Sequence, residues 1–106
     1  MKDYIINNIT YKVGKNAKEN TELINLSNAN WYWFHLEKFS SCHVVICSEE
    51  LTNEMITNAG ILVKENSKYK FQNIGINYCK IDNLIHGEEA GSVYFKSNKQ
   101  VKQFNL

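Results

Sequence analysis

The amino-acid sequence predicts a single-domain α+β fold with two principal helices and a largely antiparallel sheet. The chain has 106 residues, a length typical of one domain, and 43% of them are hydrophobic, as expected for a globular protein. Two segments carry apolar residues at helical spacing, and most of the other apolar residues fall in short β-rich runs. Most of these runs are joined by short connections, which favours antiparallel pairing.

The N-terminal segment predicts a β-hairpin. Two β-rich runs, Tyr4–Ile6 and Ile9–Val13, are separated by Asn7 and Asn8. Paired asparagines tolerate the positive φ that a tight hairpin turn requires. Gly14 ends the second run.

The next segment predicts the first helix, over about Ala17–Leu26. Asn16 is placed to cap its N-terminus, and Glu19, three residues later, is placed to return the hydrogen bond of a capping box. Leu23 and Leu26 are expected to supply its apolar contacts.

The most aromatic stretch of the chain, Trp31–Leu36, is interpreted as a strand. It is followed, after a short connection, by a second β-rich run over Cys42–Cys47, so the two are expected to form an antiparallel hairpin. A turn centred on Phe39 would place His35 opposite His43. A register slip of one residue would move one of the histidines to the other face.

The second half of the chain predicts one long helix and three strands. The helix is expected over about Glu49–Glu65, with Ser48 as its N-cap. A strand is expected over Ile74–Ile81. The segments Gly91–Lys96 and Val101–Phe104 are expected to form a closing hairpin around the intervening Asn-Lys pair.

The composition argues against a strong nonspecific nucleic-acid binder. The formal net charge is +1, and every one of the 12 basic residues is a lysine. Affinity for nucleic acid without sequence preference comes from many neutralised phosphates, so this chain has the charge only for a local patch. Lysine contacts phosphate as a point charge, without the bidentate fork of arginine. A·T-rich codon bias explains the lysine-only usage better than function does.

The sequence predicts a soluble, cytoplasmic protein without a membrane partner. No stretch approaches the roughly 20 consecutive apolar residues that span a bilayer, and the N-terminus lacks the pattern of a signal peptide. Three cysteines, Cys42, Cys47 and Cys79, are too few for a disulfide scaffold and suit a reducing compartment. We expect them to be reduced and mostly buried.

Two segments carry polar residues that are unusual for a plain core. The first, Gly14–Asn20, places a glycine, two lysines and backbone N–H groups at a helix N-terminus, which is how an anion site is built. It lacks the second glycine, and the Ser or Thr after the lysine, that a P-loop needs. In the alternative interpretation Gly14 only turns the chain, and Lys15 and Lys18 are solvated.

The second such segment is the predicted aromatic hairpin with its histidines, serines and thiol. Cys42 and His43 are adjacent on a strand, so they point to opposite faces and cannot act as a nucleophile pair. A zinc site of His35 and His43 with Cys79 or His86 would need a tertiary coincidence that the sequence does not show. Acid–base chemistry by the two histidines is a third hypothesis, while the aromatics suit a core. We predict no metal, no cofactor and no catalysis.

Across both segments the chain carries, in order, Gly14-Lys15-Asn16, Asn20, Trp33-Phe34-His35 and Ser41-Cys42-His43-Val44. This order resembles the NFACT-R family, the RNA-binding module of ribosome quality-control NFACT proteins. The family pattern runs Gly-Arg/Lys-Asn, an Asn four residues on, Asp-x-Trp-Phe-His, and then Gly/Ser-Ser/Ala-His-Val. The resemblance covers nearly the full chain, so residues 1–106 are expected to form a stand-alone NFACT-R-like domain.

Two positions depart from the family pattern. Trp31 stands where the family strand usually carries Asp, so any role of that acid is absent or replaced, and Gly60 stands where a helix Ala is usual. The long coiled coils and other domains of full NFACT proteins are not in these 106 residues. We therefore do not expect the chain to perform their tRNA-recruiting, tail-elongating work alone.

The resemblance implies a noncatalytic module that binds RNA, either tRNA or rRNA, in ribosome quality control at the ribosome. The alternative is a protein-interaction module that docks on ribosomal or other translation-related proteins. The residues expected in the RNA-binding surface, from the family motif and from the neighbouring lysines, are Lys12, Gly14, Lys15, Asn16, Lys18, Asn20, Trp33, His35, Ser41 and His43.

Overall fold

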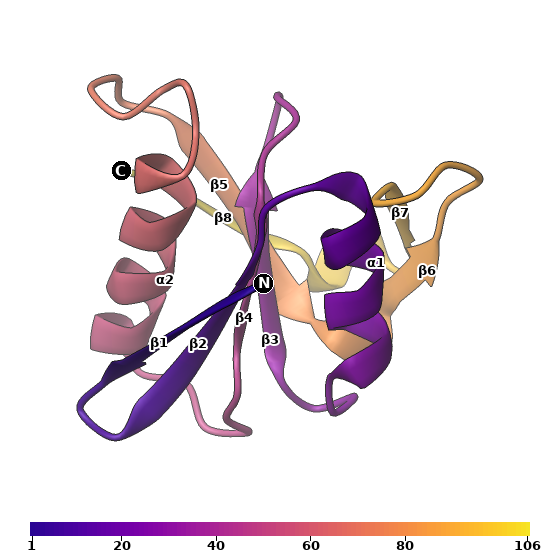
Figure 1. The fold of residues 1–106 in the computed structure, drawn as a ribbon, viewed down its shortest axis with the longest axis horizontal. Coiled ribbons are helices and arrows are strands. Elements are labelled where there is room, and N and C mark those ends of the chain that lie inside the picture. The colour runs from indigo at the N-terminus through magenta and orange to yellow at the C-terminus, as the bar shows by residue number, and fades with distance from the viewer.

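The structure is a computed structural model that describes all residues from 1 to 106, and it confirms the predicted α+β fold. Six strands form one antiparallel sheet in the order β1-β2-β4-β3-β5-β8, and α1 and α2 cover its opposite faces (Figure 1). A separate two-stranded sheet joins β6 and β7. The elements are β1 (Lys2–Ile6), β2 (Ile9–Gly14), α1 (Ala17–Leu26), β3 (Tyr32–Leu36), β4 (His43–Ile46), α2 (Asn53–Glu65), β5 (Gly75–Lys80), β6 (Leu84–His86), β7 (Val93–Phe95) and β8 (Lys102–Asn105), with short 3-10 helices at Ile81–Asn83 and Asn98–Gln100.

The N-terminal hairpin forms as predicted. Asn7 and Asn8 adopt φ values of 51° and 67°, and Ile6 pairs with Ile9 across the two-residue turn. Two consecutive residues with positive φ match the right-handed twist of the flanking strands. The turn residues therefore set the β1–β2 register.

The hairpin of β3 and β4 has the register expected from a turn centred on Phe39. Phe34 pairs with Val44, and the next step along both strands places His35 opposite His43. The two imidazole rings lie 5.1 Å apart, centroid to centroid. Both histidines consequently face the same side of the sheet.

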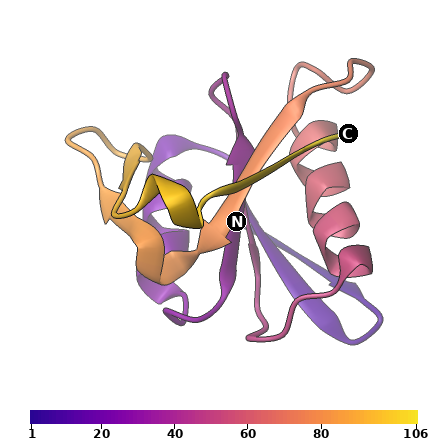
Figure 2. The ribbon, with the colours of Figure 1, turned by 180° about the vertical axis from the view of Figure 1, so that it is seen from behind.

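Side chains of the central strands alternate between two layers of core. Phe34 and Val44 belong to the larger cluster, which α2 covers. Trp33 and Val45 belong to the smaller cluster, which contains Leu23 of α1. Because both faces of the sheet are covered, these strands are apolar almost throughout rather than alternating between apolar and polar residues. Seen from behind, β5 and β8 complete the sheet beyond β3 (Figure 2).

The first helix has the predicted bounds, but one of its expected contacts is wrong. Asn20, Leu23 and Ile24 are its buried residues, whereas Leu26 is 73% exposed. Successive helix residues are about 100° apart, so Leu26 lies on the flank of the stripe that these three residues define. Ile24 takes the core position that Leu26 was expected to fill.

The second helix begins four residues later than the sequence indicates. Thr52 is the N-cap, and its side-chain oxygen accepts from the Met55 N–H at 3.2 Å. The expected cap, Ser48, instead closes a turn by accepting from the Glu50 N–H at 3.1 Å. Both residues are good caps. The segment after β4 crosses from the middle of the sheet to α2, and the helix begins at the later cap, after this crossing (Figure 1).

The predicted closing hairpin is wrong. β7 pairs with β6, a short strand that the sequence did not indicate, while β8 pairs with β5 at the edge of the main sheet. The ring of Phe104 in β8 packs against Phe34 and Tyr78 at centroid distances of 6.4 and 5.8 Å. The last strand is therefore held by burial of Phe104 on the sheet rather than by its neighbour in sequence.

The cysteines are mostly buried, as expected. Cys42 and Cys79 are buried, Cys47 is half-buried, and all three are free thiols. Burial raises the pKa of Cys42 and of Cys79 to about 11, so both remain protonated at neutral pH.

Neither α1 nor α2 has the length and hydrophobicity that a membrane-spanning helix needs.

Truncating one leucine of α1 should destabilise the domain far more than truncating its neighbour. Leu23 is fully buried, so Leu23→Ala should lower the free energy of unfolding by about 2–5 kcal/mol in urea denaturation. Leu26→Ala should change it by no more than about 0.5 kcal/mol because Leu26 is on the surface. Equal losses would contradict the packing of α1 through Leu23.

Candidate functional site

A cleft of about 920 Å³ opens at one end of the sheet. Its walls come from four places that are far apart in the sequence: the start of α1, the β3–β4 connection, the α2–β5 connection and the β6–β7 loop. All four project toward the same end of the molecule (Figure 1). The cleft is thus formed by loops that the rigid sheet positions.

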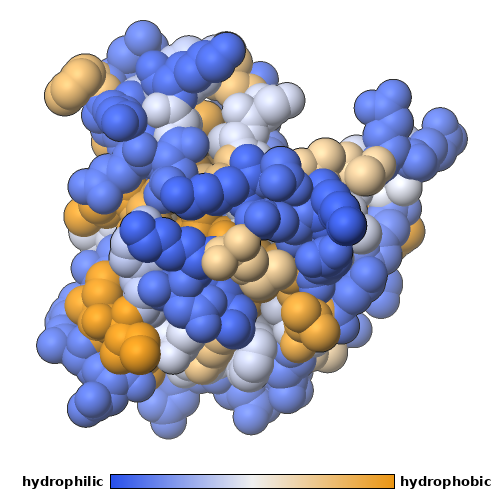
Figure 3. All heavy atoms as spheres, in the orientation of Figure 1, coloured by the Kyte–Doolittle hydropathy of each residue, from blue (hydrophilic) through white to orange (hydrophobic).

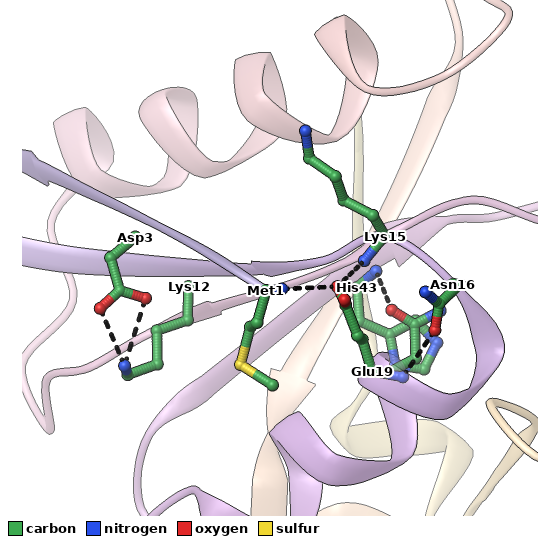
Figure 4. A network of polar contacts seen from close by, with 8 residues as sticks. Met1, Asp3, Lys12, Lys15, Asn16, Glu19 and His43 are labelled. Carbon is green, nitrogen blue, oxygen red and sulfur yellow. Dashed lines mark hydrogen bonds and ion pairs between the residues drawn. The ribbon is translucent and has the colours of Figure 1, made fainter.

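Most of the site residues predicted from the sequence meet in this cleft. Those that line it are Lys15, Asn16, Asn20, Trp33, His35, Ser41 and His43. Lys12 lies elsewhere, on the β1–β2 hairpin, where its Nζ pairs with the Asp3 carboxylate at 3.0 Å (Figure 4). Lys18 is exposed on α1 and does not line the cleft, and Gly14 lies behind Asn20.

The start of α1 is bonded to a carboxylate of the protein itself. Asn16 caps the helix by accepting from the Glu19 N–H at 2.9 Å, as predicted. The Glu19 carboxylate does not return this bond to Asn16; it accepts from the Lys15 N–H at 3.1 Å and from the Met1 ammonium at 2.9 Å. The Met1 ammonium and the Lys15 N–H both lower the pKa of Glu19. The Glu19 carboxylate therefore occupies part of the anion site predicted at this helix end.

The Lys15 side chain remains available to a ligand. It extends away from the Met1–Glu19 contact and toward the side of α2 (Figure 4). Lys15 is exposed, lines the cleft and takes part in no ion pair through its ammonium group. Its ammonium group can therefore contact an anion at this end of the cleft.

Asn20 joins α1 to the start of β4. Its side chain is only 6% exposed, and its Oδ1 accepts from the backbone N–H of His43 at 3.1 Å. Gly14 pairs with His43 in the β2–β4 ladder, and a Cβ on Gly14 would lie 2.6 Å from the same Oδ1. A side chain larger than hydrogen at position 14 would therefore displace Asn20. We call these three residues, Gly14, Asn20 and His43, the Asn20 bridge.

Aromatic rings form the floor of the cleft. Trp33 and His35 stack with their planes 6° apart and their centroids at 5.5 Å. His43 and Phe95 contact the Trp33 ring edge-on, with centroids at 5.3 and 5.7 Å. Trp33 and His43 are each 1% exposed, whereas His35 is half-buried. His35 is therefore the member of this histidine–tryptophan group that a ligand can reach.

Both histidines of the floor are neutral at physiological pH. Burial away from water and the neighbouring His35 lower the pKa of His43 to about 3, although the backbone of Gly91 opposes this. Burial also lowers the pKa of His35, against a hydrogen bond to the Leu36 carbonyl. Neither ring supplies positive charge, so the positive charge of the cleft comes from its lysines.

Lysines and aromatics that sequence reasoning missed complete the wall opposite α1. Lys38 and Phe39 come from the β3–β4 connection, and Lys68 and Tyr69 come from the α2–β5 connection. The rings of Phe39 and Tyr69 stack, with centroids 4.4 Å apart. The alternation Lys-Tyr-Lys-Phe at positions 68–71 was a signal in the sequence that could have pointed to this wall.

The structure separates Cys42 from His43, the pair that a thiol mechanism would need, although it brings His35 and His43 together. Cys42 faces the α2 side of the sheet, where its thiol contacts the Val63 carbonyl, while His43 faces α1, as strand alternation predicts. No group of three or more His, Cys, Asp or Glu side chains is placed to hold a metal ion.

Comparison with protein families identifies the domain. The model of the family described as "NFACT protein RNA binding domain" matches residues 5–97. The chain belongs to this family. Within the NFACT RNA-binding domain described here, the motif residues Gly14, Asn20 and His43 form the Asn20 bridge. That part of the motif therefore shapes the fold at the cleft.

Curated relatives share the domain but are longer. Coiled-coil domain-containing protein 25 of Mus musculus is 31% identical over 109 residues, covering 92% of this chain and 52% of the relative. The protein of the same name from Danio rerio is 32% identical over 103 residues, covering 88% of this chain and 50% of the relative. The NFACT RNA-binding domain described here thus spans about half the length of these relatives.

A solved structure has the same fold. The C-terminal part of the fibronectin/fibrinogen-binding protein from Streptococcus suis superposes with a TM-score of 0.88 at 23% sequence identity. The match covers 98% of this chain and 44% of that one. At this identity the likeness establishes the fold of the NFACT RNA-binding domain alone.

Removing the Asn20 amide should destabilise the domain. Asn20→Ala leaves the buried His43 N–H without its acceptor, so we expect the free energy of unfolding to fall by about 1–3 kcal/mol. Asn25→Ala on the same helix is the matched control, because Asn25 is exposed and bonds only the exposed His86. Urea denaturation measures both, and faster hydrogen exchange at the His43 amide should accompany the first. A protected His43 amide in Asn20→Ala would contradict the Asn20 bridge.

Stability should fall as the pH drops below about 6.5. The folded pKa of His43 lies below the unfolded value of 6.5, so the unfolded chain takes up the proton first. The free energy of unfolding should therefore decrease between pH 6.5 and about 3, by up to about 1.4 kcal/mol per pH unit for one such group. Urea midpoints at pH 7, 6 and 5 measure the slope.

Two variants assign this slope to its source. His43→Phe keeps a ring on the cleft floor and should reduce the slope, whatever its effect on stability at pH 7. Leu26→Ala removes an exposed side chain that does not titrate, so it should leave the slope unchanged. An unchanged slope in His43→Phe would show that the buried imidazole is not its cause.

Proposed function

We propose that this chain is a noncatalytic module that binds RNA in the cleft, with tRNA or rRNA as the substrate, at the ribosome in the cytoplasm. The observation that carries the proposal is the convergence of Lys15, Asn16, His35 and Ser41 on one cleft in a chain of an RNA-binding family. The proposed role in ribosome quality control rests on the NFACT-type motif alone. The curated relatives do not add to it, because the chain spans only about half of their length.

The charges of the cleft support binding of a phosphate backbone. Lys15, Lys38 and Lys68 line it, and none of them takes part in the ion pairs of the chain, which use other lysines and the N-terminus. Glu37 and Glu89 also line it and limit the excess of positive charge. Few phosphates can be neutralised, so the expected affinity is modest and sensitive to salt.

The floor of the cleft supports contacts to ribose or base. Neutral imidazole can donate and accept hydrogen bonds and can stack, but it does not pair electrostatically with phosphate. His35 is half-buried and stacked on Trp33, so its exposed edge has a fixed orientation. In this proposal the lysines at the edge of the cleft contact phosphate, and the neutral ring of the floor contacts a sugar or a base.

Binding to tRNA and to an rRNA fragment should show the salt dependence of a few phosphate contacts. Fluorescence anisotropy between about 50 and 200 mM salt should give a linear fall of log K with log salt concentration, and Lys15→Ala should reduce the slope by about one unit. Lys99→Ala is the matched control and should leave the slope unchanged, because Lys99 lies outside the cleft. The proposal fails if neither RNA binds better at low salt than to a neutral control protein.

A further inference from the structure

We infer that the wall of the cleft opposite α1 binds unpaired nucleotides, with a base stacked on Phe71. This inference rests on the proposed RNA-binding function and names the RNA class that the cleft selects. The lysine–aromatic rim, as we call it here, consists of four residues that line this wall, Lys38, Phe39, Lys68 and Tyr69, and of the two residues that follow Tyr69 in the chain, Lys70 and Phe71. RNA with unpaired bases is the substrate, rather than a continuous duplex.

Phe71 is the most exposed large apolar side chain in the chain. Its exposed fraction is 99%, compared with 73% for Leu26 and 60% for Tyr94. Single exposed apolar residues are common on protein surfaces and need no function by themselves. Phe71 differs because it follows Lys70 directly and stands two residues beyond Tyr69, which lines the cleft.

Local contacts hold the segment that carries Phe71. The Tyr69 N–H donates to Ser67 Oγ at 3.0 Å, and the Gln72 N–H donates to the Tyr69 carbonyl at 3.3 Å. Tyr69 also stacks on Phe39 across the cleft wall. The backbone on both sides of Phe71 is therefore anchored, so the ring faces solvent without a partner in the protein. An anchored backbone lowers the entropy cost of holding the ring against a base.

The three lysines of the rim have no acidic partners. The ammonium groups of Lys38, Lys68 and Lys70 take part in none of the ion pairs of the chain. In the view of Figure 3 the surface is mainly hydrophilic with separate apolar patches, not one continuous apolar face. A wide protein interface usually has an apolar centre, whereas lysines interleaved with aromatics suit a nucleic-acid strand.

Unpaired RNA fits this arrangement better than duplex RNA. The bases of a duplex are already stacked and paired, so an exposed phenyl ring has no base face to contact without breaking pairs. An unpaired base has both faces free, and stacking on an aromatic side chain is worth about 1–3 kcal/mol per base by alanine substitution. Lys68 and Lys70, which flank Tyr69, supply positive charge for the backbone phosphates next to that base.

The test compares two RNAs and three variants. A fluorescein-labelled single strand of about 12 nucleotides without self-complementarity lies within the usual site size, and the blunt duplex of the same sequence is its counterpart. Phe71→Ala should weaken single-strand binding about tenfold, including at 200 mM salt, and should leave duplex binding unchanged. Phe71→Trp, unlike Phe71→Ala, should bind the single strand as tightly as the unmodified chain does. The emission of the added indole should be quenched by the single strand but not by the duplex.

The matched control is Tyr94→Ala. Tyr94 is an exposed aromatic on β7 that does not line the cleft, so its removal should leave binding of both RNAs unchanged. The inference is overturned if Phe71→Ala binds the single strand as tightly as the unmodified chain, if it loses single strand and duplex equally, or if it changes only the self-association of the protein in sedimentation. Failure of the unmodified chain to bind any RNA would instead overturn the proposed function.

Discussion

The hydrogen bond between the Asn20 side chain and the His43 backbone is the contact on which the cleft depends. It ties the first turn of α1 to the first residue of β4, and it passes over Gly14, whose missing Cβ leaves room for the amide. If this bond is lost, the buried His43 N–H has no acceptor and α1 is no longer tied to the end of β4. Lys15, at the start of α1, would then lose its fixed position relative to His35.

The histidine–tryptophan group of Trp33, His35 and His43 belongs both to the core and to the floor of the cleft. Trp33 and His43 are buried against α1, and the partly accessible His35 is stacked on Trp33. Burial keeps both imidazoles neutral, so the floor is polar and aromatic but uncharged. Positive charge is consequently confined to the lysines at the rim. This separation suits a binder that combines a few phosphate contacts with ring contacts to ribose or base.

Local sequence patterns predicted most of the helices and strands. The features that were not predicted depend on pairing between segments distant in the sequence. The Asn7-Asn8 turn and the Asn16 cap were predicted correctly because each depends on residues close together in sequence. The sequence left two registers open for β3 and β4, and the structure has the one that a turn centred on Phe39 implies. The sequence predicted Ser48 as the cap of α2, and the structure uses Thr52, a residue type that caps helices as well. The expected partner of the last strand was its neighbour β7, whereas the burial of Phe104 against the sheet decides the actual pairing. Seven of the ten residues expected in the RNA-binding surface line the cleft, whereas Lys12 lies on the β1–β2 hairpin and pairs with Asp3.

The sequence by itself determined the α+β class, the Asn7-Asn8 hairpin turn, the cap of α1 and the family. Those properties follow from periodicity, turn residues and short motifs, which act over a few residues. Only the tertiary structure decided that Glu19 occupies the start of α1, that the α2–β5 connection brings Lys68 and Tyr69 to the cleft, and that Phe71 faces solvent. These arrangements join segments that are distant along the chain, so their energies depend on packing that no local pattern encodes.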